Sequence, residues 1–392
     1  MLIKRMRSSV RSQMWLALLA TALLTLVAAG CGDDDDDGGD GGGGGATAAI
    51  VDEAQQRLDD AGQPLTFEPP GAEIDASKAS DGTLALVIVD ERVPTLASAA
   101  DSAEEAAEVA GIQTTRFDAQ SQVNRMQQGI SQAIRESDAI ALLGIPIAAV
   151  EPSLRDAKQA NIPMISVLNN QPEPNEPGQG AGPLVYASSA PDYREGGALS
   201  ASKAIVDTDG ETNAEIFNTE EITPSTDVVE GMRSVLDQCD TCTVSQNSTP
   251  LAEWSTALTG KSQSVIRSNP DLNYILPIFD NMAIFITAGI QQAGAAGDVK
   301  NASINGTPAA LELVQQGDVL TSDVGQPNRW LGWHVVDQAL RGMIGVEPGD
   351  PAIPIRYLDQ ETLEGVDVND LDAPYGDDLG YEDGFRQLWG IG

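Results

Sequence analysis

Apolar runs of strand length alternate with longer amphipathic segments along most of this chain. The first run, TLALVIV at 83–89, has no polar alternation, which is typical of a strand buried on both faces of a parallel sheet. A polar turn follows, and then an Ala- and Glu-rich segment at 96–110 that favours a helix. The same cycle continues with predicted strands at 112–117, 139–143 and 162–168 and predicted helices at 122–136 and 147–160.

A second series begins after a loop at 171–183, which is too rich in Pro and Gly for a helix or a strand. Its predicted strands are 184–188, 213–218, 241–246, 273–278, 299–305 and 318–323, and its predicted helices are 192–206, 225–237, 254–268, 281–293 and 308–315. Strands that alternate with helices build parallel sheets through right-handed crossovers. We therefore expect an α/β fold with two doubly wound, Rossmann-like lobes and a ligand cleft beyond the carboxyl ends of their strands.

The first 30 residues have the layout of a secretory signal. Residues 1–13 carry Lys4, Arg5, Arg7 and Arg11 and no acidic residue, and 14–27 are almost wholly apolar. That apolar run is shorter than the roughly 20 residues that a helix needs to cross a bilayer. Residues 1–30 are therefore predicted to be a signal peptide and not a membrane anchor.

The residues around Cys31, LVAAGCGDDDDD at 26–37, resemble a bacterial lipobox followed by an acidic segment. Ala28 stands where the usual Leu would be, three positions before the Cys. The likeness implies that Cys31 becomes the lipidated first residue and holds the protein at the extracytoplasmic face of the membrane. The alternative is a general signal peptide cut nearby, with Cys31 incidental. Residues 31–45, rich in Asp and Gly, are typical of a flexible tether.

Charge narrows the possible partners. Loss of the signal peptide takes the formal net charge from -37 to -41, because that segment carries four basic residues and no acid. Nucleic acid and anionic bilayer surfaces are polyanions, so neither is an expected partner. Between the tether and the first lobe, 46–62 predict a short helix and 64–82 an extended connector, so that 46–82 form an N-terminal segment.

The remaining two cysteines, Cys239 and Cys242, are spaced as Cys-Asp-Thr-Cys. Outside the cytoplasm such a pair predicts a local disulfide. A redox site would need the pair to open a helix after a strand, and a zinc site would need further ligands, whereas the chain holds a single histidine, His334, in a predicted helix without an evident partner. Neither a metal nor a cofactor is expected, and no motif pairs a nucleophile with a base, so no catalytic residue is expected either.

Several segments resemble one known family. TLALVIVDERVPT, RFDAQSQVNRMQQGISQAIRESDAIALLGI and AKQANIPMISVLNNQ look like the first lobe of the ribose-binding-protein group of type I solute-binding proteins. The likeness continues through IFDNMAIFITAGIQQAG and SINGTPAALELVQQGDVLTSDVGQPNRWLGWHVVDQALRG, and covers roughly 83–358.

That resemblance implies a monomeric protein whose two lobes close over a sugar and deliver it to the permease of an ABC importer. The three crossings between the lobes would lie near 182–185, 324–327 and 351–355. The lobes would then be 83–183 plus 327–351 and 184–325 plus 352–358, with 359–392 as a C-terminal extension. A receptor of the same fold that senses its ligand for a signalling partner is the alternative, and the sequence does not separate the two.

The family's ligand contacts are carried over only in part. The turn after the first strand has Asp90 and Glu91 but no stacking aromatic, Thr226 stands in place of an arginine, and Asn169 and Asn170 replace an Asp-Arg pair. The positions that match are Trp254, Asp280, Asn305 and Gln326.

The resemblance places the indole face of Trp254 on a sugar ring, with its N–H free for a hydroxyl. Trp254 could instead pack as core, and Asn or Asp at a strand end is also a common helix cap. The ligand itself is left open among a non-pentose sugar, a polyol and a small non-sugar solute.

Overall fold

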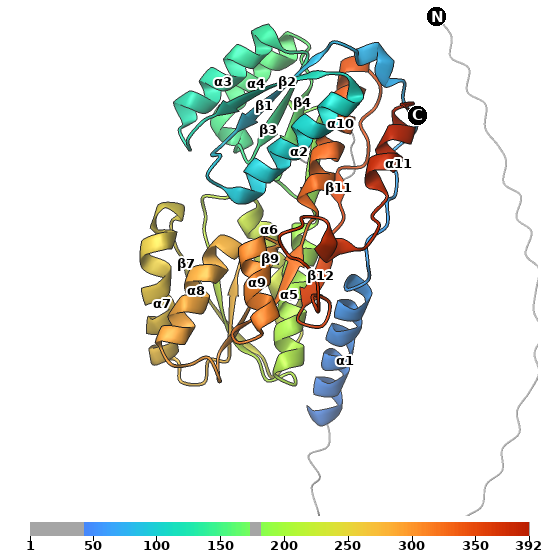
Figure 1. Ribbon diagram of the computed structural model, residues 1–392. Helices are drawn as coiled ribbons and strands as arrows, with labels where there is room; N and C mark the ends of the chain where they lie inside the picture. Colours follow the sequence, from blue (N-terminus) through green and yellow to red (C-terminus); the bar gives the residue numbers. More distant parts are fainter. Residues whose placement is uncertain (1–42, 173–181, 392) are drawn as a thin grey trace, which may run out of the picture. The chain divides into compact units, whose positions relative to one another are not determined.

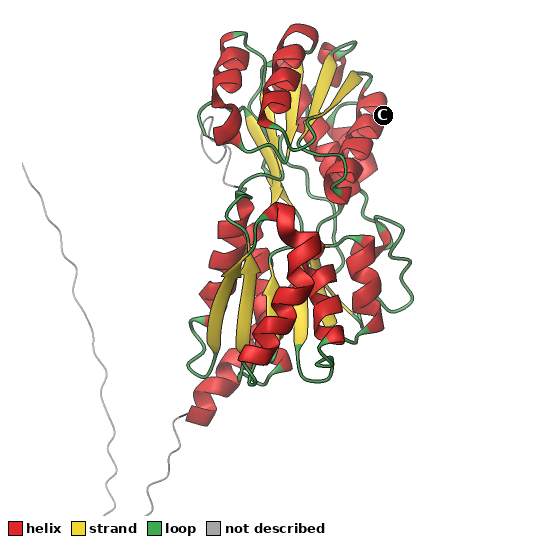
Figure 2. Ribbon diagram, turned by 90° about the vertical axis from the view of Figure 1, so that its left-hand side faces the viewer, coloured by secondary structure: helices red, strands yellow, loops and turns green. Residues whose placement is uncertain are grey.

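The computed structural model describes residues 43–172 and 182–391, and within them two six-stranded sheets form the cores of two lobes (Figure 1). The strand order is β11-β5-β4-β3-β1-β2 in the first sheet and β12-β10-β9-β8-β6-β7 in the second. Figure 2 shows each sheet flanked by helices on both faces, as a doubly wound fold requires. The predicted fold class is confirmed.

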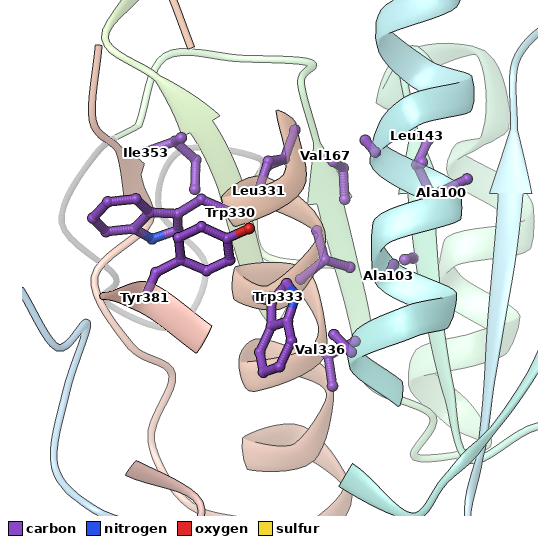
Figure 3. Packing of buried hydrophobic residues seen from close by; sticks show 14 of the residues in the cluster. Ala100, Ala103, Leu143, Val167, Trp330, Leu331, Trp333, Val336, Ile353 and Tyr381 are labelled. Carbon is purple, nitrogen blue, oxygen red and sulfur yellow. The ribbon is translucent and has the colours of Figure 1, made fainter. Parts of the chain in front are cut away.

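The first sheet is parallel throughout. Its strands are β1 (Thr83–Ile88), β2 (Gln113–Asp118), β3 (Ala139–Leu143), β4 (Met164–Val167), β5 (Ala187–Pro191) and β11 (Ala352–Ile353). Its helices are α2 (Pro94–Ala110), α3 (Val123–Glu136), α4 (Ile147–Gln159) and α10 (Asn328–Ile344). Figure 3 shows how α10 packs Leu331, Trp333 and Val336 near the small side chains Ala100 and Ala103 of α2.

The second sheet is parallel except for β12, which runs antiparallel to β10. Its strands are β6 (Asn213–Asn218), β7 (Thr243–Ser248), β8 (Tyr274–Pro277), β9 (Lys300–Asn305), β10 (Leu320–Gly325) and β12 (Arg356–Asp359). Its helices are α5 (Tyr193–Asp207), α6 (Pro224–Leu236), α7 (Trp254–Ser268), α8 (Asp280–Gln292) and α9 (Pro308–Gln316), with the short η2 (Leu251–Glu253) before α7.

The lobe assignment of two strands differs from the prediction. Residues 184–188 were predicted to open the second lobe, but β5 pairs with β4 of the first sheet, with Ala187 opposite Ile165. The chain therefore enters the second lobe between β5 and α5, and not near 182–185. Residues 352–358 were assigned to the second lobe, but Ala352 and Ile353 form β11, which pairs with β5. An apolar strand pairs with whichever sheet edge lies beside it, and its own sequence does not say which.

The segment at 359–392 is part of the folded core and not an appendage. It contains η3 (Ala373–Tyr375) and α11 (Tyr381–Leu388), and Tyr375, Phe385 and Trp389 are at most 2% exposed. The polar sequence of 359–380 had no periodicity from which this docking could be predicted.

The N-terminal segment runs beside the C-terminal one. Leu65 N donates to Tyr375 O at 2.9 Å and Ile74 N donates to Leu388 O at 2.7 Å. Before them, α1 (Gly43–Ala61) packs on α5 of the second lobe, where Arg57 forms an ion pair with Glu195 at 2.8 Å; η1 (Ala76–Ala79) precedes β1. Figure 1 shows both segments on the side of the lobes where β11 and β12 lie.

His334 has partners that its sequence context did not reveal. It is 2% exposed, its Nδ1 lies 2.8 Å from Ser189 Oγ, and its Nε2 lies 2.7 Å from the Asp350 carbonyl oxygen. Burial lowers its pKa, so the neutral ring is favoured in the folded protein. His334 is a packed structural residue of α10.

Candidate ligand-binding site

A cavity of about 190 Å³ lies between the lobes and is lined by both of them. In the first lobe its walls come from the segments that follow β1, β2, β3 and β4. In the second lobe they come from the first residue of α5, from the segments that follow β6, β7 and β8, and from the last residue of β9. Gln326, in the passage from β10 to α10, also lines it. The cavity thus lies beyond the carboxyl ends of the parallel strands, where open α/β sheets bind ligands.

Five of the nine predicted contact residues line this cavity: Asp90, Asn169, Trp254, Asn305 and Gln326. The other four, Glu91, Asn170, Thr226 and Asp280, are not among its lining residues.

Asp90 is 5% exposed and its carboxylate is already fully used. Its Oδ1 accepts from Arg92 N at 3.0 Å and Nε at 2.9 Å, and its Oδ2 accepts from Arg92 Nη2 and Ser121 Oγ at 2.6 and 2.7 Å. The hydrogen bonds from Arg92 hold the pKa of the Asp90 carboxyl well below its usual range, against the effect of burial. Asp90 is therefore an ionised, paired wall residue.

Asn169 has the strongest geometric case for a ligand contact. It is 4% exposed, it lines the cavity, and its side-chain amide has no hydrogen-bond partner among the described residues. The residue before it, Leu168, has a φ of 54°, so the backbone turns sharply where β4 ends. An amide that lines a cavity in this way can donate to and accept from a ligand.

Asn305 and Gln326 add two more amides from neighbouring strand ends. Asn305 is half-buried and has a φ of 129°, a conformation that residues with a side chain rarely adopt and that concentrates at functional sites. Gln326 is 2% exposed and its Nε2 donates to Asn328 Oδ1 at 3.2 Å, which leaves its Oε1 available as an acceptor. Carboxamides donate and accept without carrying charge.

Trp254 is both a wall of the cavity and part of the core. It is 6% exposed and belongs to the apolar cluster of the second lobe. The expectation that its N–H is free was wrong, because Nε1 donates to the Thr249 carbonyl at 3.0 Å. What Trp254 can offer a ligand is apolar ring surface.

Asp280 faces the inside of the second lobe and not the cavity. Its side chain is fully buried and accepts from Ser303 Oγ at 2.6 Å and from Thr307 N and Oγ1 at 2.7 and 2.6 Å. It interacts with the equally buried Asp323, whose Oδ1 accepts from Gly306 N at 2.8 Å. Burial raises the pKa of both carboxyls. The pair fixes the turn at 305–307 behind the cavity wall.

The other three predicted residues also lie elsewhere. Glu91 forms an ion pair with Arg116 at 2.6 Å, and Thr226 is exposed on α6. Asn170 lines a neighbouring surface pocket, where its Oδ1 accepts from Ser166 Oγ at 3.1 Å. A strand-end position alone did not reveal which way these side chains turn.

Two aromatic residues of the lining were missed by sequence reasoning. Tyr193, the first residue of α5, and Phe279, directly before α8, have ring centroids 6.3 Å apart in an edge-to-face arrangement. Both stand at helix starts that follow predicted strands, and that position was the available signal. The aromatic side chains absent from the turn after β1 are thus supplied by the second lobe.

The composition of the lining limits the charge of a ligand. Among the residues that the structure describes, it contains the carboxylates of Asp90 and Glu221 and no Lys, Arg or His. The described residues also contain no group of three or more His, Cys, Asp or Glu side chains placed to hold a metal ion. Such a lining disfavours an anionic ligand.

The sequence of residues 91–345 matches the family model described as a periplasmic binding protein domain. The chain belongs to this periplasmic binding protein family. Since the family consists of solute-binding proteins and not of enzymes, the chain is a binding protein and not an enzyme. A search of curated protein sequences found no matching relative.

Solved structures share the fold of this binding protein at low sequence identity. A 5-methylthioribose transporter solute-binding protein from Thermotoga lettingae, in complex with 5-methylthioribose, is 16% identical over 80% of this chain and 99% of its own, with a TM-score of 0.68. An ABC transporter solute-binding protein from Bacillus halodurans with bound myo-inositol is 20% identical over 76% and 99%, with a TM-score of 0.65. One from Agrobacterium vitis with bound α-D-tagatopyranose is 19% identical over 72% and 96%, with a TM-score of 0.65.

Proposed function

We propose that this periplasmic binding protein captures a small uncharged solute, a sugar or polyol, between its lobes and delivers it to an ABC importer. The amide of Asn169, which lines the interlobe cavity and makes no hydrogen bond to another described side chain, is the observation that carries the proposal. The ligands named for the proteins of similar fold, a methylthioribose, an inositol and a hexose, support it.

Closure follows from the placement of the amides on both sides of the cavity. Asn169 belongs to the first lobe and Asn305 to the second, so one ligand that bonds to both is held most tightly when the lobes are closed. Such a ligand shifts the population toward the closed state by the difference in its affinity for the two states. Each hydroxyl buried without a partner would cost about 1 to 3 kcal/mol, so the amides also set specificity.

The test is a thermal-shift screen of the full chain in detergent against monosaccharides, polyols, nucleosides and amino acids. A ligand at about a hundred times its dissociation constant adds roughly 2.7 kcal/mol of stability. A hit among sugars or polyols is expected, and Asn169→Ala should weaken it at least tenfold. The adjacent Asn170→Ala is the matched control, because that amide lies outside the cavity. Hits confined to amino acids, or an equal loss of ligand affinity in Asn169→Ala and Asn170→Ala, would contradict the proposal.

A role in transport can be distinguished from a role in sensing by deletion of the importer's permease. Deletion of the importer's permease should abolish uptake of the identified solute while the binding protein still binds it. Uptake that persists would instead support a receptor that reports its ligand to a signalling partner.

We also propose that Cys31, which lies outside the described residues, carries the lipid that holds the protein at the extracytoplasmic face of the membrane. None of the helices within 43–172 and 182–391 has the length and apolar character needed to span a bilayer. The Cys31→Ser variant should therefore leave the membrane fraction. Fractionation that still finds this variant in the membrane would contradict the proposed lipidation. Retention of residues 1–30 in the mature chain would contradict the predicted signal peptide.

A further inference from the structure

Two glycines stand beside two amides of the cavity wall, at the ends of neighbouring strands. Asn305, the last residue of β9, is followed by Gly306, and Gln326 is preceded by Gly325, the last residue of β10. These strands are paired, with Asn305 opposite Gly325. A contact that fixes both glycines therefore also fixes the backbone from which the two amides extend.

The backbone at this point needs support from its surroundings. Asn305 has a φ of 129° and Gly306 a φ of 68°, so two successive residues have positive φ values. For Asn305, which has a side chain, this conformation costs free energy and persists only where neighbouring groups enforce it. Asp323 provides one restraint, because its Oδ1 accepts from Gly306 N at 2.8 Å. A turn without enough support would relax toward a negative φ and move the Asn305 amide out of its place in the wall.

The tip of the Tyr375 side chain lies against both glycines. A Cβ built on Gly306 would lie 2.3 Å from the Tyr375 hydroxyl oxygen, and one built on Gly325 would lie 2.7 Å from the same atom. Tyr375 is 2% exposed, and its hydroxyl has no hydrogen-bond partner among the described residues. Burial raises the pKa of the phenol, with a smaller contribution from Asp323, so the group stays neutral. Its oxygen therefore occupies, as a packing contact, the space beside the two glycine Cα atoms.

Tyr375 reaches this place because the chain around it is fixed by hydrogen bonds. Its carbonyl oxygen accepts from Leu65 N of the N-terminal segment at 2.9 Å. Arg356 of β12 donates from Nη1 to the carbonyl oxygen of Pro374, the residue before it, at 2.7 Å. All of these residues lie outside 91–345, the part of the chain that matches the family model. The support for the two amides thus comes from segments on either side of that domain.

We propose that Tyr375 is a positioning residue of the ligand site, through which the C-terminal segment sets the affinity for the ligand. Its hydroxyl oxygen holds the two glycine backbones where the amides of Asn305 and Gln326 line the cavity. A void in its place removes packing contacts and lets the turn relax, so that these amides bind the ligand less well. The contact with Asn169 in the other lobe stays unchanged. The inference rests on the proposed function, because it concerns the same site.

Titration calorimetry on the full chain in detergent tests this role. The probe is the compound that binds most tightly among myo-inositol, D-tagatose, 5-methylthio-D-ribose and the other sugars and polyols of the thermal-shift screen. Tyr375→Phe keeps the ring and removes only the oxygen that touches the glycines, and it should raise the dissociation constant at least about fivefold. Trp389→Phe is the matched control, because it removes a hydrogen bond between the same segment and α10. It should lower stability and change the dissociation constant less than about twofold.

A double-mutant cycle separates positioning from a general loss of structure. Asn305→Gly removes one positioned amide but tolerates the φ of 129°, so in that background the effect of Tyr375→Phe should fall below about threefold. In an Asn169→Ala background, where both positioned amides remain, the effect should stay at least about fivefold.

Three results would overturn the inference while the proposed function stands. They are equal affinities for wild type and Tyr375→Phe, an equal effect of Tyr375→Phe in the two backgrounds, and as large a loss of affinity in Trp389→Phe. If no sugar or polyol binds to the wild-type protein, the proposed function is overturned and the inference with it.

Discussion

The indole nitrogen of Trp389 donates a hydrogen bond to Asp337 Oδ1 at 3.0 Å, and both residues are buried. The other carboxylate oxygen of Asp337 accepts from Arg341 Nε at 2.7 Å. The Trp389 ring also stacks on Trp333, with centroids 5.5 Å apart. These contacts join the end of the C-terminal segment to α10, so the segment contributes to the stability of the first lobe.

Trp389→Phe should therefore destabilise the protein by about 1 to 3 kcal/mol, because it leaves a buried carboxylate oxygen without its donor. The change in stability is measured by urea unfolding, monitored by circular dichroism and not by tryptophan fluorescence. Gln387→Ala, at an exposed position in the last turn of α11, which ends directly before Trp389, is the control and should change stability by no more than about 0.5 kcal/mol. Equal stabilities for wild type and Trp389→Phe would show that this hydrogen bond does not stabilise the first lobe.

The close packing of α5 on α6 predicts that a larger side chain at Gly197 will destabilise the protein. A Cβ at Gly197 would lie 2.1 Å from the Val228 carbonyl oxygen, which is backbone and cannot rotate away. Gly197→Ala should cost about 1 to 3 kcal/mol through forced separation of the helices.

Gly260→Ala in α7 is the matched control for that substitution. Apart from its chain neighbours and the backbone of its own helix, no atom of residues 43–172 or 182–391 lies within 4 Å of a Cβ built there. Alanine should therefore stabilise the protein by about 0.5 to 1 kcal/mol. The two variants should move the unfolding midpoint in opposite directions. A shift in the same direction would refute the packing argument.

The buried pair Asp280 and Asp323 predicts a dependence of stability on pH. Burial raises the pKa of both carboxyls in the folded protein, and repulsion from Asp280 adds to the effect on Asp323. The folded state therefore binds protons more strongly than the unfolded state. The stability that the protonated carboxyls contribute is fully present below their unfolded pKa of about 3.9, and it is lost as pH rises through their pKa in the folded protein.

Asp323→Asn should remove this loss of stability with rising pH, because the amide oxygen can still accept a hydrogen bond from Gly306 N but carries no negative charge. We expect the variant to gain stability relative to wild type as pH rises from 5 to 8, as measured by urea unfolding. The exposed Asp318→Asn should run parallel to wild type over the same range. A constant difference between Asp323→Asn and wild type at every pH would contradict the prediction.

The structure joins Cys239 and Cys242 as a disulfide with Cα atoms 5.2 Å apart, and its presence in the native protein stays a prediction. Both thiols should resist alkylation until a reductant is added. Reduction should cost little stability, because so short a loop restrains the unfolded chain only slightly. Mass spectrometry that finds alkylated cysteines in the unreduced native protein would refute the pairing.

The sequence by itself determined the elements and the fold class. The predicted segments 139–143, 213–218 and 254–268 coincide with β3, β6 and α7, and most other boundaries lie within two or three residues. Such elements are readable because the burial of a strand or of one helix face imposes a local period on the sequence. Asn169, Asn305 and Gln326 were named from the resemblance to the solute-binding family and not from periodicity, and all three line the cavity.

Only the tertiary structure decided which sheet each strand joins and which way each strand-end side chain turns. β5 joined the first sheet because the free edge of β4 lies beside it, and nothing within 187–191 encodes that neighbour. Asp280 turned inward because Ser303 of β9, Asp323 of β10 and Thr307 before α9 surround it. The N–H of Trp254 was taken by a carbonyl five residues earlier. Contacts of this kind depend on distant partners, whereas periodicity reports only on the local segment.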